Sequence, residues 1–463
     1  MSETALGWIY LVTIICFVLA LKGLSSPRTA RPGNLLGAAG MLVAVVATFF
    51  VRPHLHHLGL MLVAIVLGTI VGVPAARQVP MTAMPQMVAA FNGVGGGAAA
   101  VVSFAEYLRS GGDAGGVVVT AIIFSTMVGC VSFTGSVLTY LKLQELMTGR
   151  PITYDGQQAV FGGLAAAIVA GAIWVGAAGG DGGNGGLALL AVAALALGVA
   201  LVLPVGGADV PVVISLLNSF TGLAVAASGF ALKNTLLIVS GTLVGASGAL
   251  LTRMMATAMG RSLPNIMFGA LKGGSTAGST AELTTDRQVR SSTPDDIGVM
   301  LAYSQRVTIV PGYGLAVAQA QHTIRELVDL LERRGVEVVY AIHPVAGRMP
   351  GHMNVLLAEA NVPYEQLKEM DEVNPEFSRT DVALVVGAND VVNPAARDEP
   401  GSPIYGMPIL DVDQAKHVVF MKRSMRPGFA GIDNKLLYDE KTVMLFGDAK
   451  DSITKLIADV KTL

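Results

Sequence analysis

The chain has 463 residues, of which 52% are hydrophobic and only 14% are charged, and its formal net charge is −2. This composition is too apolar for a soluble protein of this length and predicts a membrane protein. The near-neutral charge and the lack of a long basic run exclude a surface that could neutralise nucleic-acid phosphates, so neither DNA nor RNA is expected as a partner.

The first half of the chain contains apolar runs of about twenty residues, the length that crosses a bilayer core. The first run is expected to be retained, because no Lys or Arg precedes it as in a signal peptide. Cys16 and Cys130 lie inside predicted spans and indicate neither a disulfide nor a metal site. Nine spans are predicted, near residues 7–24, 35–51, 57–74, 84–105, 117–140, 157–176, 186–204, 210–231 and 235–253.

The basic residues between the spans predict the orientation. An odd number of spans places the termini on opposite sides, and basic loops favour the cytoplasm. With the amino terminus outside, the inner loops are the more basic ones, so the carboxyl-terminal domain is expected in the cytoplasm. The inner set is Lys22, Arg28, Arg31, Arg77, Lys142 and Arg150, and the outer set is Arg52, Arg109 and Lys233.

The sequence predicts a multi-pass α-helical membrane domain (1–260), a Gly- and Ser-containing linker (261–300) and a second domain (301–463). In the second domain, short β-branched strands alternate with charged helices, which predicts an α/β Rossmann-like, doubly wound parallel sheet. Strands are expected at 307–310, 336–342, 382–387, 417–422 and 442–446, and helices at 315–334, 352–360 and 448–461.

The turn after the first predicted strand has the pattern of a dinucleotide-binding site. Gly312 and Gly314 lie between strand and helix, where glycines let a diphosphate approach the backbone. This interpretation is favoured over a plain turn. NAD is disfavoured as the ligand, because Val317 replaces the third glycine and no carboxylate follows the second strand to bind a ribose hydroxyl.

Two other strand ends carry polar residues at the same predicted edge of the sheet. Lys422, Arg423 and Ser424 suit a 2′-phosphate, although a solvated basic strand end explains them equally well. Asn389 and Asp390 offer an amide and a carboxylate to a nicotinamide or a ribose, and a simple Asx turn is the equal alternative.

Titratable residues are absent from the cores of the predicted spans, where Asn92, Ser136 and Asn218 are the notable polar residues. Such groups face a bundle interior or a water path, or hold helices together by hydrogen bonds. A proton path through this chain would therefore need water, or an ionisable group from another subunit.

Segments along nearly the whole chain resemble the β subunits of proton-translocating NAD(P) transhydrogenases. In that family the carboxyl-terminal domain binds NADP(H), a separate alpha subunit binds NAD(H), and hydride passes directly between the nicotinamides while protons flow inward. The resemblance implies a Re/Si-specific transhydrogenase, a dimer of alpha–beta units, and a multi-pass location among the lipids of a bacterial-type inner membrane. The matching segments are residues 135–137, 209–219, 312–321, 342–360, 387–396, 422–425 and 444–450.

The resemblance also implies roles for individual residues. Hydride transfer needs no side-chain acid or base and no metal, so the implied residues bind cofactor or line a proton path. They are the phosphate turn (Gly312, Tyr313, Gly314, Ala316, Val317), a loop over the cofactor (Arg348), the nicotinamide side (Gly387, Ala388, Asn389, Asp390), the 2′-phosphate site (Lys422, Arg423, Ser424), the lid (Gly428, Phe429, Ala430) and the proton path (Asn92, Ser136, Asn218, Asp209).

Two positions depart from the family pattern. Phe429 stands where members often have Tyr, and Asn92 stands where many have a histidine credited with proton handling. The second departure suggests that the titrating residue comes from a helix of the partner subunit.

The sequence argues against two other classes of function. A channel or secondary transporter regulated by a nucleotide domain would need ion ligands or broken helices at mid-membrane, and the sequence has no evident ones. A Rossmann-like domain used only for docking would need neither a phosphate turn nor a basic strand end.

Overall fold

The computed structural model describes residues 3–51, 57–80, 83–110, 115–144, 146–148, 151–206, 209–258, 262–268, 289–347, 351–400, 402, 404–428 and 430–463. The chain divides into two compact units, one made of Met1–Thr148, Ile152–Leu203 and Val213–Leu251, the other of Gly149–Pro151, Pro204–Val212 and Thr252–Leu463. The domain boundaries at residues 260 and 300 stay a prediction, and each unit is described by itself.

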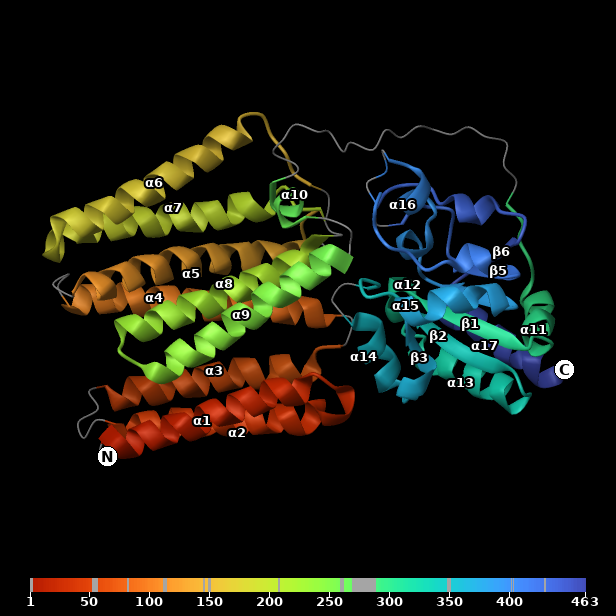
Figure 1. The fold of residues 1–463 in the computed structure, drawn as a ribbon, viewed down its shortest axis with the longest axis horizontal. Coiled ribbons are helices and arrows are strands. Elements are labelled where there is room, and N and C mark those ends of the chain that lie inside the picture. The colour runs from red at the N-terminus through yellow and green to blue at the C-terminus, as the bar shows by residue number, and fades with distance from the viewer. Residues whose placement is uncertain are drawn as a thin grey trace. The chain divides into compact units, whose positions relative to one another are not determined.

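Nine helices in the described part of the chain are long and apolar enough to cross a membrane, which confirms the predicted spans. They run roughly alongside one another (Figure 1). The helices are α1 (Glu3–Leu24), α2 (Pro27–Val51), α3 (Leu58–Gln78), α4 (Met84–Ser110), α5 (Gly116–Leu143), α6 (Gln157–Ala178), α7 (Asn184–Val202), α8 (Val210–Ala231) and α9 (Thr235–Ala258).

Small residues bring these helices into backbone contact, as their abundance predicts. A Cβ atom added to Gly129 of α5 would lie 2.6 Å from the carbonyl oxygen of Gly96 in α4, and one added to Gly222 of α8 would lie 2.4 Å from the nitrogen of Gly245 in α9. Neither contact tolerates a side chain, so these glycines set the spacing of the two helix pairs.

One prediction about the membrane unit was wrong. Lys142 was placed in a loop, outside the span, but α5 continues to Leu143 and buries this lysine to 4% exposure. Its ammonium donates to the carbonyl oxygens of Val202 (2.9 Å) and Leu203 (2.7 Å), at the end of α7. Carbonyl groups at the end of a helix have no partner within that helix, so they can accept hydrogen bonds from a buried ammonium group. Without such acceptors, an apolar environment would exclude the charge.

The second unit is built on a sheet of six parallel strands within the described residues, in the order β3-β2-β1-β4-β5-β6. This is the doubly wound Rossmann order and confirms the predicted fold class. The strands are β1 (Arg306–Pro311), β2 (Glu337–Ile342), β3 (Leu367–Glu369), β4 (Val382–Val386), β5 (His417–Lys422) and β6 (Thr442–Phe446). The three-residue β3 was not predicted, since it lacks β-branched residues.

Alternate strand residues face two apolar layers, as the pleat requires. One layer gathers Ile309 and Leu384 with apolar residues of the longer helices, and the other gathers Val310 and Val385 with residues of short helical segments. The helices of this unit are α10 (Leu263–Phe268), α11 (Pro294–Ala302), α12 (Tyr313–Val317), α13 (Gln321–Arg333), α14 (His352–Glu359), α15 (Met370–Val373), α16 (Ala395–Asp398) and α17 (Ala449–Thr462).

The helix predicted over residues 315–334 is two helices. α12 ends at Val317, and Gln319 adopts a left-handed conformation with φ 50° before α13 begins at Gln321. The backbone N–H of Ala320 closes α12 by donating to the carbonyl oxygen of Leu315 at 3.1 Å. The apolar periodicity continues across this break, which explains why the sequence did not reveal it.

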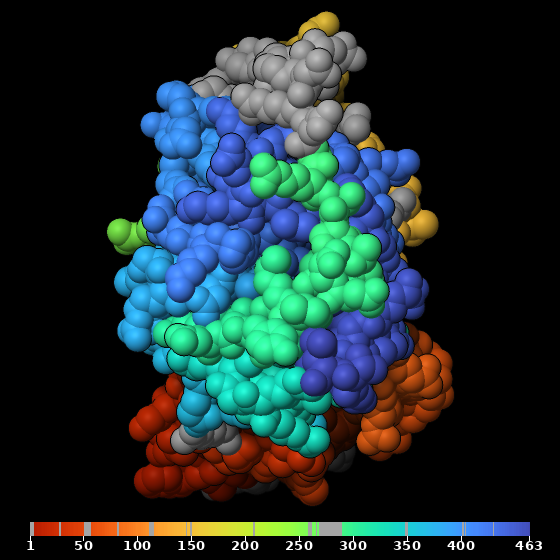
Figure 2. All heavy atoms as spheres, turned by 90° about the vertical axis from the view of Figure 1, so that its right-hand side faces the viewer, coloured from red at the N-terminus to blue at the C-terminus, as the bar shows by residue number. Residues whose placement is uncertain are grey.

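Part of the segment between the predicted domains folds with the sheet. Ser291 forms a parallel bridge with Met444 of β6, and Ile297 and Leu301 of α11 are fully buried. Figure 2 shows residues 289–302, in green, lying on the surface of the unit beside α17 in dark blue. These residues therefore cover the β6 edge of the sheet.

Candidate functional site

The turns after β1 and β4 meet at the centre of the sheet. From these two neighbouring strands the chain winds to opposite sides, which makes this the switch point where open α/β sheets bind ligands. The N–H groups of Gly312 and Gly314 donate to the carbonyl oxygens of Val386 (2.9 Å) and Gly387 (3.0 Å). The two turns are thus held together by their backbones.

The three glycines of these turns leave no room for side chains. A Cβ atom on Gly312 would lie 2.4 Å from the Cα of Ala388, and one on Gly314 would lie 2.6 Å from the Cα of Gly387. Gly387 itself has φ +68°, a conformation that favours glycine. The glycine pattern read from the sequence therefore marks a place where two loops touch directly.

The short helix α12 continues from this turn. Ala316 is fully buried, whereas Val317, at the position of the missing third glycine, is exposed. The ring of Tyr313 meets the ring of His352 edge-on, with centroids 6.1 Å apart. Of these three predicted residues, Ala316 belongs to the core and Tyr313 packs against it, whereas Val317 is exposed.

Asn389 and Asp390 follow the β4 turn and face the segment predicted as a lid. The Asn389 amide donates to Asp390 Oδ1 at 2.9 Å, and Asp390 Oδ2 accepts the backbone N–H of Ala430 at 2.8 Å. A Cβ atom on Gly428 would lie 2.4 Å from Asp390 Oδ1. The structure thus brings the β4 turn against Gly428 and Ala430.

Lys422, at the end of β5, belongs to the same cluster. Its ammonium donates to Asn389 Oδ1 at 3.1 Å and to the carbonyl oxygen of Arg426 at 3.0 Å. Burial lowers the pKa of this ammonium, and the nearby carboxylates of Asp390 and Asp433 offset part of the effect. Lys422 therefore ties β5, the β4 turn and the following segment together.

The other two residues of the predicted 2′-phosphate site have different surroundings. The Arg423 side chain is 61% exposed and pairs with Asp448 across 3.5 Å. Ser424 Oγ accepts the backbone N–H of Arg426 at 3.5 Å. Arg423 is therefore the residue of the three best placed to reach an incoming anion. Arg348 and Phe429 lie outside the described residues.

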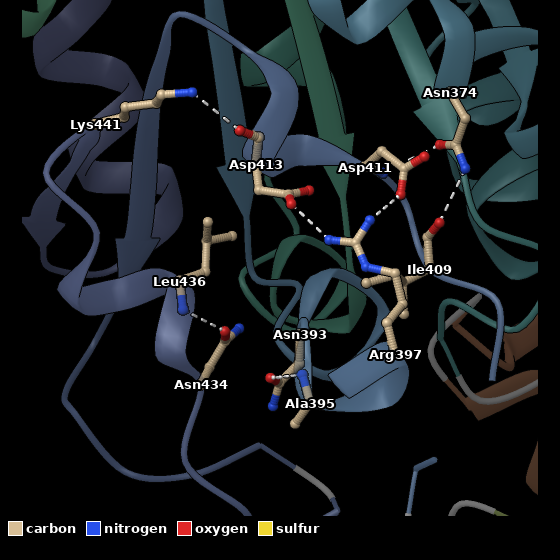
Figure 3. Close-up of polar contacts among 10 residues, drawn as sticks. All are labelled: Asn374, Asn393, Ala395, Arg397, Ile409, Asp411, Asp413, Asn434, Leu436 and Lys441. Atoms are coloured by element: carbon tan, nitrogen blue, oxygen red, sulfur yellow. Dashed lines mark hydrogen bonds and ion pairs between the residues drawn. The ribbon is translucent and has the colours of Figure 1, made fainter. Parts of the chain in front are cut away.

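Buried asparagines hold this region, and sequence reasoning missed them. Asn434 and Asn393 are 1% and 0% exposed, and each caps a neighbouring turn, Asn434 at Leu436 N and Asn393 at Ala395 N (Figure 3). Asn434 stands two residues before the apolar run Leu436-Leu437-Tyr438, and an Asn at this position is a helix-start signal that the sequence did offer. Its long-range contact has no sequence signal.

His343 is a second missed residue, at the end of β2. Its ring is 1% exposed, Nε2 lies 2.8 Å from the carbonyl oxygen of Pro408, and Nδ1 accepts the N–H of Val345 at 3.2 Å. Burial lowers the pKa of this imidazole to about 4. The ring is therefore neutral and joins two loops of the unit.

Polar groups also meet inside the membrane unit. The Asn92 amide nitrogen donates to Ser136 Oγ at 2.9 Å and lies 3.4 Å from Ser132 Oγ, which in turn lies 2.6 Å from Thr221 Oγ1. Among the described residues, Asn92 Oδ1 is a buried acceptor with no hydrogen-bond partner. The prediction named Asn92 and Ser136 but missed Ser132 and Thr221.

The other two predicted residues of the proton path lie on α8 or just before it. Asn218, on α8, is half-buried, and no hydrogen bond of its side chain is recorded within the described part of the chain. Asp209 is buried just before α8 begins. A second polar cluster links the hydroxyls of Ser103, Ser125 and Ser228 at 2.8–2.9 Å.

Comparisons with known proteins show the family of the chain. The family model described as the NAD(P) transhydrogenase beta subunit matches residues 6–459. A protein of Rhodospirillum rubrum named NAD(P) transhydrogenase subunit beta is 46% identical over 458 residues, covering 97% of both chains, and the same values hold for the protein of a named strain of that species. The chain belongs to the NAD(P) transhydrogenase beta subunit family.

Proposed function

We propose that this chain binds NADP(H) in its carboxyl-terminal unit and accepts hydride from NADH held by an alpha subunit, coupled to inward proton translocation. The observation that carries the proposal is the convergence of three strand ends. The interlocked glycines after β1 and β4 share the β4 turn with Asn389, which accepts the ammonium of Lys422 at the end of β5, and Arg423 follows Lys422 in the chain.

These residues fit NADP(H). Gly312 and Gly314 carry no side chains in the turn between β1 and α12, and a glycine turn at this position suits the diphosphate. The 2′-phosphate would lie near Arg423, Lys422 and Ser424, since guanidinium and ammonium groups form charge-assisted hydrogen bonds to phosphate. The nicotinamide would lie on the side of Asn389 and Asp390. Arg348 and the lid residues Gly428, Phe429 and Ala430 would cover the cofactor.

The nicotinamide ring supplies the hydride chemistry when the cofactor is bound. The residues of this chain position the ring and exclude water from it, and we propose none of them as an acid or base in hydride transfer. Direct transfer requires the reacting carbons to approach to roughly 3–3.5 Å, so the partner's NAD(H) site must dock over this edge of the sheet.

Coupling to protons would be conformational. We propose that Asn92, Ser136, Asn218 and Asp209 line the proton path, with Ser132 and Thr221 added by their contacts with Asn92. The orphaned Asn92 Oδ1 supports this role, because a buried acceptor without a partner suits a water or a donor from a partner helix. A change of protonation there would alter the relative affinities for NADP⁺ and NADPH.

The assembly would be a dimer of alpha–beta units in a bacterial-type inner membrane. The basic residues of the predicted inner loops support an amino terminus outside and a cytoplasmic carboxyl-terminal unit. Lipid would contact the membrane helices, whose outward apolar side chains, such as Leu60 and Val71 of α3, are exposed in the chain by itself.

The test is isotope transfer in liposomes containing this chain and its alpha subunit. With deuterium at the transferred position of NADH, we expect deuterium in NADPH without loss to water. The nucleotides are added outside and so reach only the chains whose carboxyl-terminal units face outward. For these chains we expect an acidic interior to raise the initial rate of NADP⁺ reduction, because protons then flow toward the nucleotide-binding side. Label lost to solvent would contradict direct transfer, and a rate indifferent to the gradient would contradict coupling. Ion flux without label transfer would favour a regulated transporter.

A further inference from the structure

Two segments that lie far apart in the sequence are joined by two buried asparagines. The first segment is the β4 turn, residues 387–393, and the second is residues 430–434, where the predicted lid returns to the domain. Asn393 Nδ2 donates to the carbonyl oxygen of Asp433 at 3.0 Å, and Asn434 Nδ2 donates to that of Asn389 at 3.1 Å. The two contacts cross between the same pair of segments.

Asn434 uses its two polar atoms for different tasks. Its Oδ1 accepts the N–H of Leu436 at 3.0 Å and so caps the 3₁₀ turn Lys435–Tyr438. Its Nδ2 reaches back to the Asn389 carbonyl. Only the amide orientation with Oδ1 toward Leu436 satisfies both contacts, because the reverse would set donor against donor. Oδ1 therefore makes a local contact, and Nδ2 holds the β4 turn.

The Asn389 carbonyl has one other hydrogen bond, from the N–H of Val392 at 3.4 Å, which is long. Loss of the Asn434 donor would leave this oxygen poorly satisfied in a partly buried place. The side chain of the same residue receives the Lys422 ammonium, and the next residue, Asp390, accepts the Ala430 N–H. A shift of the Asn389–Asp390 peptide would therefore disturb both partners.

We propose that Asn434 is a positioning residue that fixes the Asn389–Asp390 peptide, and through it the β4 turn against Ala430, in the geometry that binds NADP(H). The inference rests on the proposed NADP(H) site, and it assigns no contact between Asn434 and the cofactor. Asn434 acts through Asn389, whose backbone it holds, while its own side chain stays 1% exposed.

The two tasks of Asn434 can be separated by substitution. Asn434→Asp and Asn434→Ser both keep an oxygen that caps the Leu436 N–H, since Asp and Ser are good N-caps. The aspartate has no N–H to donate to Asn389, and the serine hydroxyl is too short to reach it. One variant adds a charge and the other does not, so an effect common to both reports the lost donor.

Asn374 supplies the matched control. Its Oδ1 accepts the N–H of Asp411 at 3.1 Å and its Nδ2 donates to the carbonyl oxygen of Ile409 at 3.0 Å (Figure 3). The chemistry is the same as at Asn434, but the tether holds residues 409–411, to which no cofactor contact is assigned. The N–H of Leu410 meets the β4 turn at the Val391 carbonyl oxygen, 2.9 Å away. Asn374→Asp therefore removes an equivalent bond from a segment that has no hydrogen bond to Asn389 or Asp390 within the described residues.

The experiment measures NADPH affinity by calorimetry and melting temperature for the full chain in detergent. We expect about ten-fold weaker NADPH binding in both Asn434 variants, the size of one hydrogen bond, and less than about two-fold change in Asn374→Asp. Melting temperatures of the Asn434→Asp and Asn374→Asp variants should fall by similar amounts, so the loss of affinity cannot be attributed to stability.

Wild-type affinity in both Asn434 variants would overturn the positioning role alone. Weaker binding only in Asn434→Asp would overturn it too, because the added charge and not the lost donor would be responsible. An equal loss of affinity in Asn374→Asp would reduce the role of Asn434 to general stability. A wild-type chain that binds no NADPH would contradict the proposed function and the positioning role together.

Discussion

His343 is a side chain whose charge is fixed by its hydrogen bonds. Nδ1 accepts the Val345 N–H, and Nε2 faces the Pro408 carbonyl oxygen, so only the neutral tautomer with a proton on Nε2 fits both partners. Protonation of Nδ1 would set two N–H groups against each other in a site with 1% exposure. The low pKa follows from this burial.

His343 should make the second unit sensitive to acid. The imidazole has a pKa of about 4 when folded and about 6.5 when unfolded. Its contribution to stability is therefore fully present above pH 6.5 and is lost as the pH falls toward 4, by about 3 kcal/mol in total. His343→Gln cannot titrate and should flatten this part of the pH dependence.

The measurement is the urea midpoint of the second unit in the full chain at pH 7 and pH 5, followed by tyrosine fluorescence. Trp8 and Trp174 lie in the membrane unit and do not report on this transition. If the midpoint of wild type and of His343→Gln falls equally between the two pH values, the assignment to His343 is wrong.

At the scale of elements, the site depends on how β1 and β4 end. Their turns are hydrogen-bonded to each other, and the glycines allow an approach that no Cβ atom would permit. The β5 end joins them through Lys422 and Asn389. The proposed binding surface therefore depends on three strand ends in register, and a change in one turn must move the next.

Gly314→Ala tests this interlock. The new Cβ atom would lie 2.6 Å from the Cα of Gly387, and backbone on both sides would have to separate. We expect NADPH affinity to fall by about 5-fold to 150-fold, because overpacking of this kind shifts backbone and typically costs about 1–3 kcal/mol. Calorimetry on the full chain measures the change.

Gly335→Ala is the control for Gly314→Ala. Gly335 has φ +86° and nothing within 4 Å of an added Cβ atom, so alanine there is strained but meets no neighbour. It should lower stability by about 1 kcal/mol without changing affinity. Equal affinities of the Gly314→Ala variant and the wild type would show that the turns can separate without consequence for the site.

At the scale of the whole molecule, the sequence revealed the two-part architecture because length and periodicity carry it. Runs of apolar residues predicted the nine helices, and strand–helix alternation predicted the parallel sheet. The sequence predicts Lys142 outside the span because its charge ends an apolar run. Its burial against the carbonyls at the end of α7 is a tertiary contact, which the apolar run does not reveal. Local patterns predict elements, and partners distant in sequence decide where they end.

The same distinction separates the site residues that could be predicted from those that could not. Gly312, Gly314 and Lys422 stand at strand ends, which the pattern marks. Asn434 acts on Asn389, and His343 on Pro408, across 45 and 65 positions of chain. No local pattern encodes such pairs, so the residues that hold the site are visible only in the fold.

We propose that the end of β5 recognises the 2′-phosphate of NADP(H). The most direct measurement compares the affinities of the full chain for NADPH and NADH by calorimetry, in wild type and in Lys422→Ala/Arg423→Ala. Lys416→Ala, at the opposite end of β5 and paired with Asp381, is the control. We expect wild type and the control to prefer NADPH by about 100-fold or more, the size of two charge-assisted hydrogen bonds. The double variant should lose this preference. Equal affinities of the wild type for NADPH and NADH, or an undiminished preference in the double variant, would contradict the assignment of the 2′-phosphate to Lys422 and Arg423.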